Sequence, residues 1–179
     1  MKSQILSIVS HHISNKMYGE NNFKWIIKNK VAGSHSPSVE ELRLYKELGF
    51  TAIVSLQENI EKKPVWDKVL PYYDIIRYTE KDARDVGLEF LHIPVYDMKP
   101  PTVEQYKQFF NFAKDHIVVV HCYAGIGRTG CILGSYIGLE FNLSGEDAVK
   151  KLREIWPVYI QTDEQRKSVV DFINLMRSH

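Results

Sequence analysis

Cysteine is scarce in this chain of 179 residues, and its scarcity excludes a disulfide-stabilised fold. Only two cysteines occur, Cys122 and Cys131, and they lie nine positions apart, which is no disulfide framework. A chain of this length buries enough surface to form a core without disulfides or bound metal. We therefore expect a reducing, cytoplasmic location, in which any functional cysteine acts as a thiol.

Long apolar runs and an excess of either charge are also absent. No stretch approaches the about 18 to 20 consecutive apolar residues of a membrane span. The first residues lack the apolar core and the cleavage site of a signal peptide. Lys and Arg number 23 against 22 Asp and Glu, a net charge of +1. This balance gives no reason to expect a nucleic-acid partner or binding to a membrane surface.

The histidines show no metal-ligand spacing, so we expect no metal and no cofactor. Those outside the segment that carries Cys122 are His11, His12, His35, His92 and His116. No repeat or low-complexity segment divides the chain. We expect residues 1–22 to form an N-terminal extension, helical from Ser3 to Ser14, and residues 23–179 to form one domain that acts as a monomer.

Local patterns predict an α/β fold with a central, mostly parallel sheet flanked by helices. Strands are expected at 23–27, 31–32, 51–56, 88–95 and 117–120, and helices at 38–48, 102–114, 129–141, 145–155 and 163–176. Residues 64–87 fit either a helix or a strand. In parallel sheets the functional site lies beyond the carboxyl ends of the central strands, which directs attention to the residues after 117–120.

That segment reads His-Cys-Tyr-Ala-Gly-Ile-Gly-Arg-Thr-Gly from His121 to Gly130. Its glycines allow successive N–H groups to point into one concavity, and the expected helix adds its own unsatisfied donors. The planar guanidinium of Arg128 suits two phosphate oxygens at once. Cys122 lies in the same positive field, which favours a thiolate placed to attack phosphorus. The alternative is a buried structural cysteine followed by an ordinary turn.

The segment resembles the signature His-Cys-x5-Arg-Ser/Thr-Gly of the cysteine-based protein tyrosine phosphatase superfamily. The residues that match in register are His121, Cys122, Gly125, Arg128, Thr129 and Gly130. The short chain looks like the compact dual-specificity branch, in particular its small archaeal-type members. The likeness extends from about Val31 to the C-terminus.

The resemblance implies a role for each matched residue. Cys122 would be the nucleophile, and Arg128 would hold the phosphate together with the loop backbone of Tyr123, Ala124, Gly125, Ile126 and Gly127. Thr129 would hydrogen-bond the thiolate, and the ring of His121 would brace the loop.

The resemblance also assigns the general acid to Asp97, which follows Ile93-Pro94-Val95-Tyr96. The leaving oxygen needs a proton, and the same carboxylate can then activate water. Rival carboxylates, which do not stand where the family pattern puts this group, are Asp82, Asp85 and Glu89. Gln165 matches the residue that positions the hydrolytic water, with Gln161 as a weaker candidate. Glu58 could brace Arg128.

We therefore expect metal-independent hydrolysis of phosphotyrosine in phosphorylated proteins, with phosphoserine and phosphothreonine as further substrates, through a phosphocysteine. The alternatives are a lipid or nucleotide phosphomonoesterase of the same superfamily, a phosphate-binding module without turnover, and rhodanese-like sulfur transfer. Tyr123, Ala124 and Ile126 bring no lysine into the loop, which argues against a polyphosphorylated headgroup. We expect Cys131 to be a core residue rather than a redox partner, and Tyr78 to be a core or surface aromatic.

Overall fold

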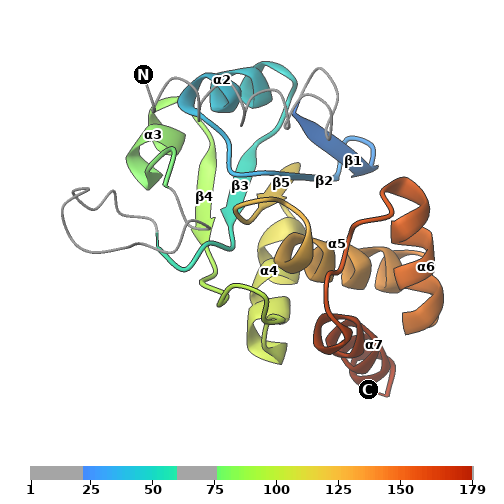
Figure 1. Ribbon diagram of the computed structural model, residues 1–179. Helices are drawn as coiled ribbons and strands as arrows, with labels where there is room; N and C mark the ends of the chain where they lie inside the picture. The colour runs from blue at the N-terminus through green and yellow to red at the C-terminus, as the bar shows by residue number, and fades with distance from the viewer. Residues whose placement is uncertain (1–21, 60–75, 179) are drawn as a thin grey trace, which may run out of the picture.

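The structure is a computed structural model that describes residues 22–59 and 76–178 (Figure 1). The helix expected from Ser3 to Ser14 and the first half of the ambiguous segment 64–87, up to residue 75, lie outside these residues. The five strands are β1 (Phe23–Ile27), β2 (Val31–Ser34), β3 (Ala52–Ser55), β4 (Glu89–His92) and β5 (Val118–His121). They form one sheet in the order β1-β2-β5-β3-β4, in which only β1 runs antiparallel to its neighbour. The predicted mostly parallel α/β architecture is confirmed.

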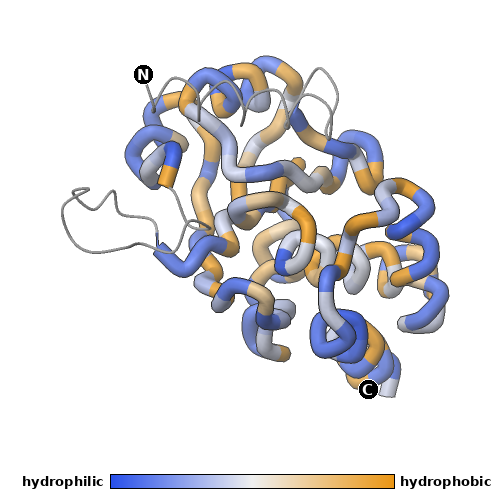
Figure 2. Tube along the Cα trace, viewed as in Figure 1, coloured by the Kyte–Doolittle hydropathy of each residue, from blue (hydrophilic) through white to orange (hydrophobic). Residues whose placement is uncertain are grey.

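Helices cover both faces of this sheet. Within the described residues they are α2 (Val39–Glu47), α3 (Glu80–Asp85), α4 (Val103–Ala113), α5 (Gly127–Glu140), α6 (Gly145–Ile155) and α7 (Asp163–Arg177). The strand residues alternate between two cores. Ala32, Ile53 and Val119 pack with α2 and α3, whereas Val54 and Val120 pack with α4 to α7. Because both faces are covered, the three central strands β2, β3 and β5 are fully buried and carry a polar side chain only at their last residue, and Figure 2 shows hydrophobic positions along β3 and β4.

Side-chain caps explain where most helices begin. Ser38, Thr79, Thr102 and Thr162 each open a helix through a capping box, and Ser144 caps α6. In the segment that fitted either element, Thr79 starts α3, so the helical interpretation holds for its described part. None of the described helices is both long and apolar enough to cross a membrane.

Three expected boundaries are corrected. The strand expected at 88–95 is the shorter β4, which ends at His92; Pro94, which has no N–H to donate to a sheet, follows it. The last strand extends to His121 because that residue pairs with both neighbouring strands. Helix α5 begins at Gly127, two residues before the expected start, so that Arg128 belongs to its first turn.

Candidate active site

The candidate site lies at the carboxyl edge of the sheet, where β5 is flanked by β2 and β3. His121 ends β5 opposite Ser34 and Ser55, and the next five residues lead directly into α5. Neighbouring segments hold this loop: the Ser36 N–H donates to the Tyr123 carbonyl at 2.9 Å, and the Leu56 N–H donates to the His121 carbonyl at 2.7 Å. The loop is therefore anchored on both sides by backbone contacts.

Cys122 lies at the base of the loop and is only 3% exposed. The Gly125 N–H donates to its Sγ atom at 3.2 Å. Gly125 has a φ of 72°, in the left-handed region that glycine adopts without a Cβ penalty. The turn therefore aims a backbone donor at the sulfur of Cys122.

The N-terminus of α5 adds further backbone N–H donors next to that of Gly125. Its N-cap residue is Ile126, which offers no side-chain acceptor, whereas every other helix in the described ranges has a capping side chain. Within the described residues, the first N–H groups at the positive end of the α5 dipole therefore have no side-chain cap. Such a terminus binds an anion.

His121 braces the loop from the sheet side. Its Nδ1 atom lies 2.9 Å from the Cys122 carbonyl oxygen. A carbonyl can only accept, so Nδ1 carries the proton and Nε2 accepts from the Tyr78 hydroxyl at 2.5 Å. Burial, above all, lowers the pKa of His121 to about 3, so the ring stays neutral. The His121 ring therefore contacts the loop backbone on one side and the Tyr78 hydroxyl, on a residue expected to be an ordinary aromatic, on the other.

Arg128 is buried and joins the loop to the segment after β4. Its Nη1 atom donates to the carbonyls of Val95 at 3.0 Å and Leu56 at 3.5 Å, and its Nη2 atom lies 3.0 Å from Oδ1 of Asp97. The Asp97 side chain is 34% exposed, so it reaches solvent while it contacts a buried cation. Glu58 accepts the Asp97 N–H at 2.8 Å and thus holds the backbone of the candidate acid.

The rival carboxylates have other partners. Asp82 accepts the Thr79 N–H in the cap of α3, and Asp85 pairs with Lys81 on the surface of that helix. Glu89 opens β4 at the opposite end of the strand from the site. The structure brings Asp97 to the loop and leaves these three outside it.

Two glutamines pack against the start of α5. A Cβ atom built on Gly127 would lie 2.4 Å from Gln161 Oε1 and 2.7 Å from Gln165 Nε2, so both amides occupy the place of a side chain there. Gln165 is buried, and its Oε1 accepts the Gln161 N–H at 2.8 Å. Its Nε2 atom has no hydrogen-bond partner among the described residues.

Two buried residues of α5 complete the surroundings of the loop. Thr129 is fully buried, and its hydroxyl makes no hydrogen bond within the described parts of the chain. Cys131 is a free thiol whose pKa is raised by burial, and its Sγ donates weakly to the Gln165 carbonyl at 3.9 Å. Cys131 is thus a core residue in its reduced form.

A cysteine and an arginine joined by a five-residue loop, between a central parallel strand and a helix N-terminus, define the class of cysteine-based phosphatases. Residues 28–139 match the family model described as "Polymorphic toxin system, DSP-PTPase phosphatase". The chain belongs to this family, a compact dual-specificity group of the cysteine-based protein tyrosine phosphatase superfamily.

Relatives and solved structures agree with this membership. Tyrosine-protein phosphatase CDC14 of Saccharomyces cerevisiae is 29% identical over 93 residues, which cover 49% of this chain and only 17% of the yeast protein. An uncharacterized protein of Methanocaldococcus jannaschii is 31% identical over 106 residues, 56% of this chain and 66% of that protein. The crystal structure of Tk-PTP in the active form superposes with a TM-score of 0.69 at 26% identity, covering 86% of this chain and 97% of that one. PTPMT1 in complex with PI(5)P shares the fold, with a TM-score of 0.73 at 19% identity over 88% of this chain and 97% of that one.

Proposed function

We propose that this phosphatase hydrolyses phosphotyrosine in cytoplasmic phosphoproteins through a phosphocysteine intermediate, without a metal ion, and that residues 23–179 are its catalytic domain. One observation carries the proposal: Arg128, in the first turn of the helix that follows the Cys122 loop, contacts Asp97. A nucleophile, an anion-binding cation and a proton donor thus converge at one edge of the sheet. The positive charge that a metal would bring to the phosphate is supplied by Arg128 and by the N-terminus of α5.

In the first step the Cys122 thiolate attacks phosphorus. The S–P bond forms, the ester P–O bond breaks, and the leaving oxygen takes a proton from the Asp97 carboxyl group. Arg128 and the N–H groups of residues 123–128 stabilise the charge on the three remaining phosphate oxygens. The Gly125 N–H already donates to the Sγ atom of the nucleophile.

In the second step water hydrolyses the phosphocysteine. Asp97, now a carboxylate, accepts the proton of the attacking water, the S–P bond breaks, and its electron pair returns to Cys122. The packing of both amides on Gly127 supports Gln161 and Gln165 as the groups that place this water, and Gln161 is the more exposed of the two. The unpartnered hydroxyl of Thr129 is available to donate to the departing thiolate.

The side chains of the loop favour a single aryl phosphate over a multiply charged headgroup. Tyr123, Ala124 and Ile126 add no cation beside Arg128. A second phosphate on the substrate would therefore meet no opposite charge from this loop, and its desolvation would be uncompensated. This observation supports a phosphoprotein substrate over a lipid or nucleotide.

The test is hydrolysis of p-nitrophenyl phosphate against pH in excess EDTA by the wild type, Cys122→Ala and the matched control Cys131→Ala. We expect full wild-type activity in EDTA, retention in Cys131→Ala and complete loss in Cys122→Ala. A panel of phosphotyrosine and phosphoserine peptides and phosphatidylinositol phosphate then identifies the substrate class. Activity that survives in Cys122→Ala, or that EDTA abolishes, would refute the mechanism. A folded wild type that binds vanadate without turnover would instead indicate a phosphate-binding module.

A further inference from the structure

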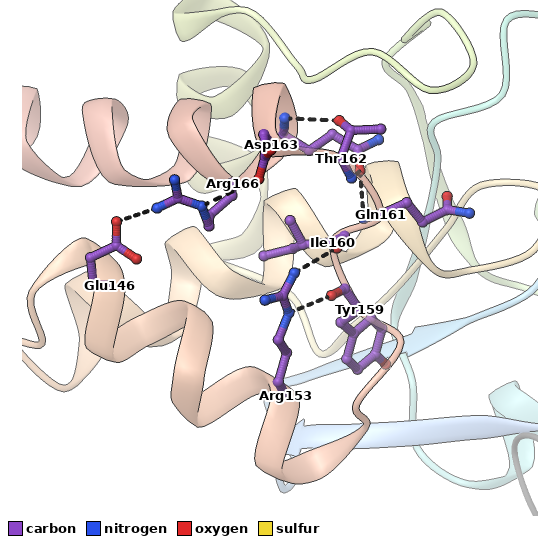
Figure 3. A network of polar contacts seen from close by, with 9 residues as sticks. Glu146, Arg153, Tyr159, Ile160, Gln161, Thr162, Asp163 and Arg166 are labelled. Atoms are coloured by element: carbon purple, nitrogen blue, oxygen red, sulfur yellow. Dashed lines mark hydrogen bonds and ion pairs between the residues drawn. The ribbon is translucent and has the colours of Figure 1, made fainter.

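The segment before α7 turns at Ile160 (Figure 3), and this turn contacts Ile126 at the end of the loop that follows Cys122. Ile160 has a φ of 64°, a left-handed conformation that a β-branched residue rarely adopts. In this conformation its N–H donates to the Ile126 carbonyl at 3.3 Å, at the N-cap of α5. A backbone this unfavourable persists only where its surroundings hold it.

Arg153, on the last turn of α6, provides that hold. Its Nε atom donates to the Tyr159 carbonyl at 3.1 Å and its Nη2 atom to the Ile160 carbonyl at 2.9 Å. Two successive carbonyls thus share one rigid guanidinium, a geometry that a lysine cannot reproduce. Figure 3 shows the guanidinium reaching across to these carbonyls from α6.

The Ile160 turn packs closely against α5. A Cβ atom on Gly130 would lie 2.8 Å from the Ile160 nitrogen, so the two backbones are in direct contact. The next residue, Gln161, donates its N–H to Gln165 and places its amide oxygen against Gly127. The position of the Gln161 side chain is therefore set by the Ile160 turn, and the turn is held by Arg153.

We propose that Arg153 is a positioning residue for the second chemical step and that it acts through Gln161. The inference rests on the proposed two-step function. In the first step the attacking sulfur is fixed by β5 and the loop, so no further alignment is required. In the second step a free water must approach phosphorus opposite Sγ, form the P–O bond and pass its proton to Asp97 while the S–P bond breaks. Only this step depends on a group that orients the water.

Arg166, on α7, is the matched control for Arg153, because it is also an arginine that contacts α6. It pairs with the carboxylates of Glu146 and Asp163, and within the described residues its side chain makes no hydrogen bond to the Ile160 turn (Figure 3). The Arg166→Ala substitution removes an arginine and two surface ion pairs, and such pairs contribute little to stability. Arg153→Ala and Arg166→Ala therefore differ in whether the turn loses its two donors.

The experiment is rapid-mixing kinetics with p-nitrophenyl phosphate, combined with mass spectrometry of the acid-quenched enzyme. For Arg153→Ala we expect kcat to fall about tenfold while kcat/KM, which reports the first step, stays within about twofold. A burst approaching one p-nitrophenolate per enzyme, with phosphate on Cys122, should accompany the slow turnover. Gln161→Ala should show the same pattern, and the double variant should be no slower than either single one. Arg166→Ala should match the wild type.

Equal losses in kcat and kcat/KM without a burst, in Arg153→Ala that is folded by circular dichroism, would overturn the inference. If that variant does not fold, Arg153→Lys decides, because lysine keeps the charge but has a single nitrogen in place of the two that reach the Tyr159 and Ile160 carbonyls. A burst larger than that of Arg166→Ala supports the inference, and a burst equal to it refutes the inference. A wild type that turns over without ever carrying phosphate on Cys122 would refute the proposed function itself.

Discussion

The Nη2 atom of Arg128 lies 3.0 Å from Oδ1 of Asp97, so the cation suited to a substrate phosphate already holds a carboxylate. The other terminal nitrogen of Arg128 donates to the Val95 carbonyl, two residues earlier on the same segment. One guanidinium therefore joins the loop after β5 to the segment after β4. A phosphate that binds Arg128 competes with this carboxylate for the same cation, while the contact with Val95 keeps that segment in place.

This competition predicts opposite effects of Asp97→Asn on binding and on turnover. Removing the carboxylate charge should tighten binding of inorganic phosphate by up to about fivefold, the range of a partly exposed ion pair. Loss of the acid should lower kcat by about 10²- to 10³-fold. The loss should be greater with phenyl phosphate than with p-nitrophenyl phosphate, whose more acidic phenol leaves without full protonation. Calorimetry with phosphate and steady-state rates on both esters measure these effects.

Asp85→Asn is the control for this variant, since Asp85 pairs with Lys81 on α3 away from the site. It should change neither affinity nor rate. Wild-type turnover of phenyl phosphate by Asp97→Asn would show that another group is the acid.

Local sequence patterns were sufficient to predict the sheet and the candidate loop. Apolar runs such as 118–120 and the spacing of Cys122, Gly125 and Arg128 are local, and they fix a strand, a turn and a helix start together. The partner of His121 could not be found in this way, because Tyr78 lies 43 positions earlier, and only the tertiary packing of β5 brings them together. The role of Arg153 depends on the left-handed turn at Ile160, for which the sequence carries no glycine signal.

Gly125→Ala tests whether the left-handed turn serves the thiolate. Alanine at a φ of 72° should cost about 1–2 kcal/mol of stability and move the N–H away from Cys122 Sγ. We expect slower alkylation of Cys122 by iodoacetamide near pH 6 and a lower kcat/KM. Gly49→Ala is the matched control: its φ of 93° imposes a similar backbone penalty, and no atom within 4 Å would meet the new Cβ. It should lose stability and keep full reactivity, and equal reactivity in both variants would contradict the role of Gly125.

The buried neutral ring of His121 predicts a specific loss of stability in mild acid. Its pKa is lowered from 6.5 to about 3, so the unfolded chain binds a proton that the folded chain does not between these values. The contribution of the neutral ring to the free energy of unfolding should therefore be fully present above pH 6.5. It should decrease as the pH falls toward 3, with a limiting slope of about 1.4 kcal/mol per pH unit. The pKa of Glu41 is lowered from 4.5 to about 2, so its contribution is lost only below pH 4.5. The interval from pH 5 to 6.5 thus isolates the histidine contribution.

Urea unfolding across that interval measures the slope for the wild type and for His121→Gln, whose amide can still donate to the Cys122 carbonyl and accept from Tyr78. The variant should be less stable at pH 7 and should lose stability less steeply as the pH falls, because it has no ring to protonate on unfolding. Tyr78→Phe should lower stability at pH 7 by about 1–3 kcal/mol, because it leaves the Nε2 atom of His121 buried without a donor. Parallel curves for the wild type and His121→Gln would show that the ring binds a proton equally in the folded and unfolded chains over this interval, so that burial does not keep it neutral.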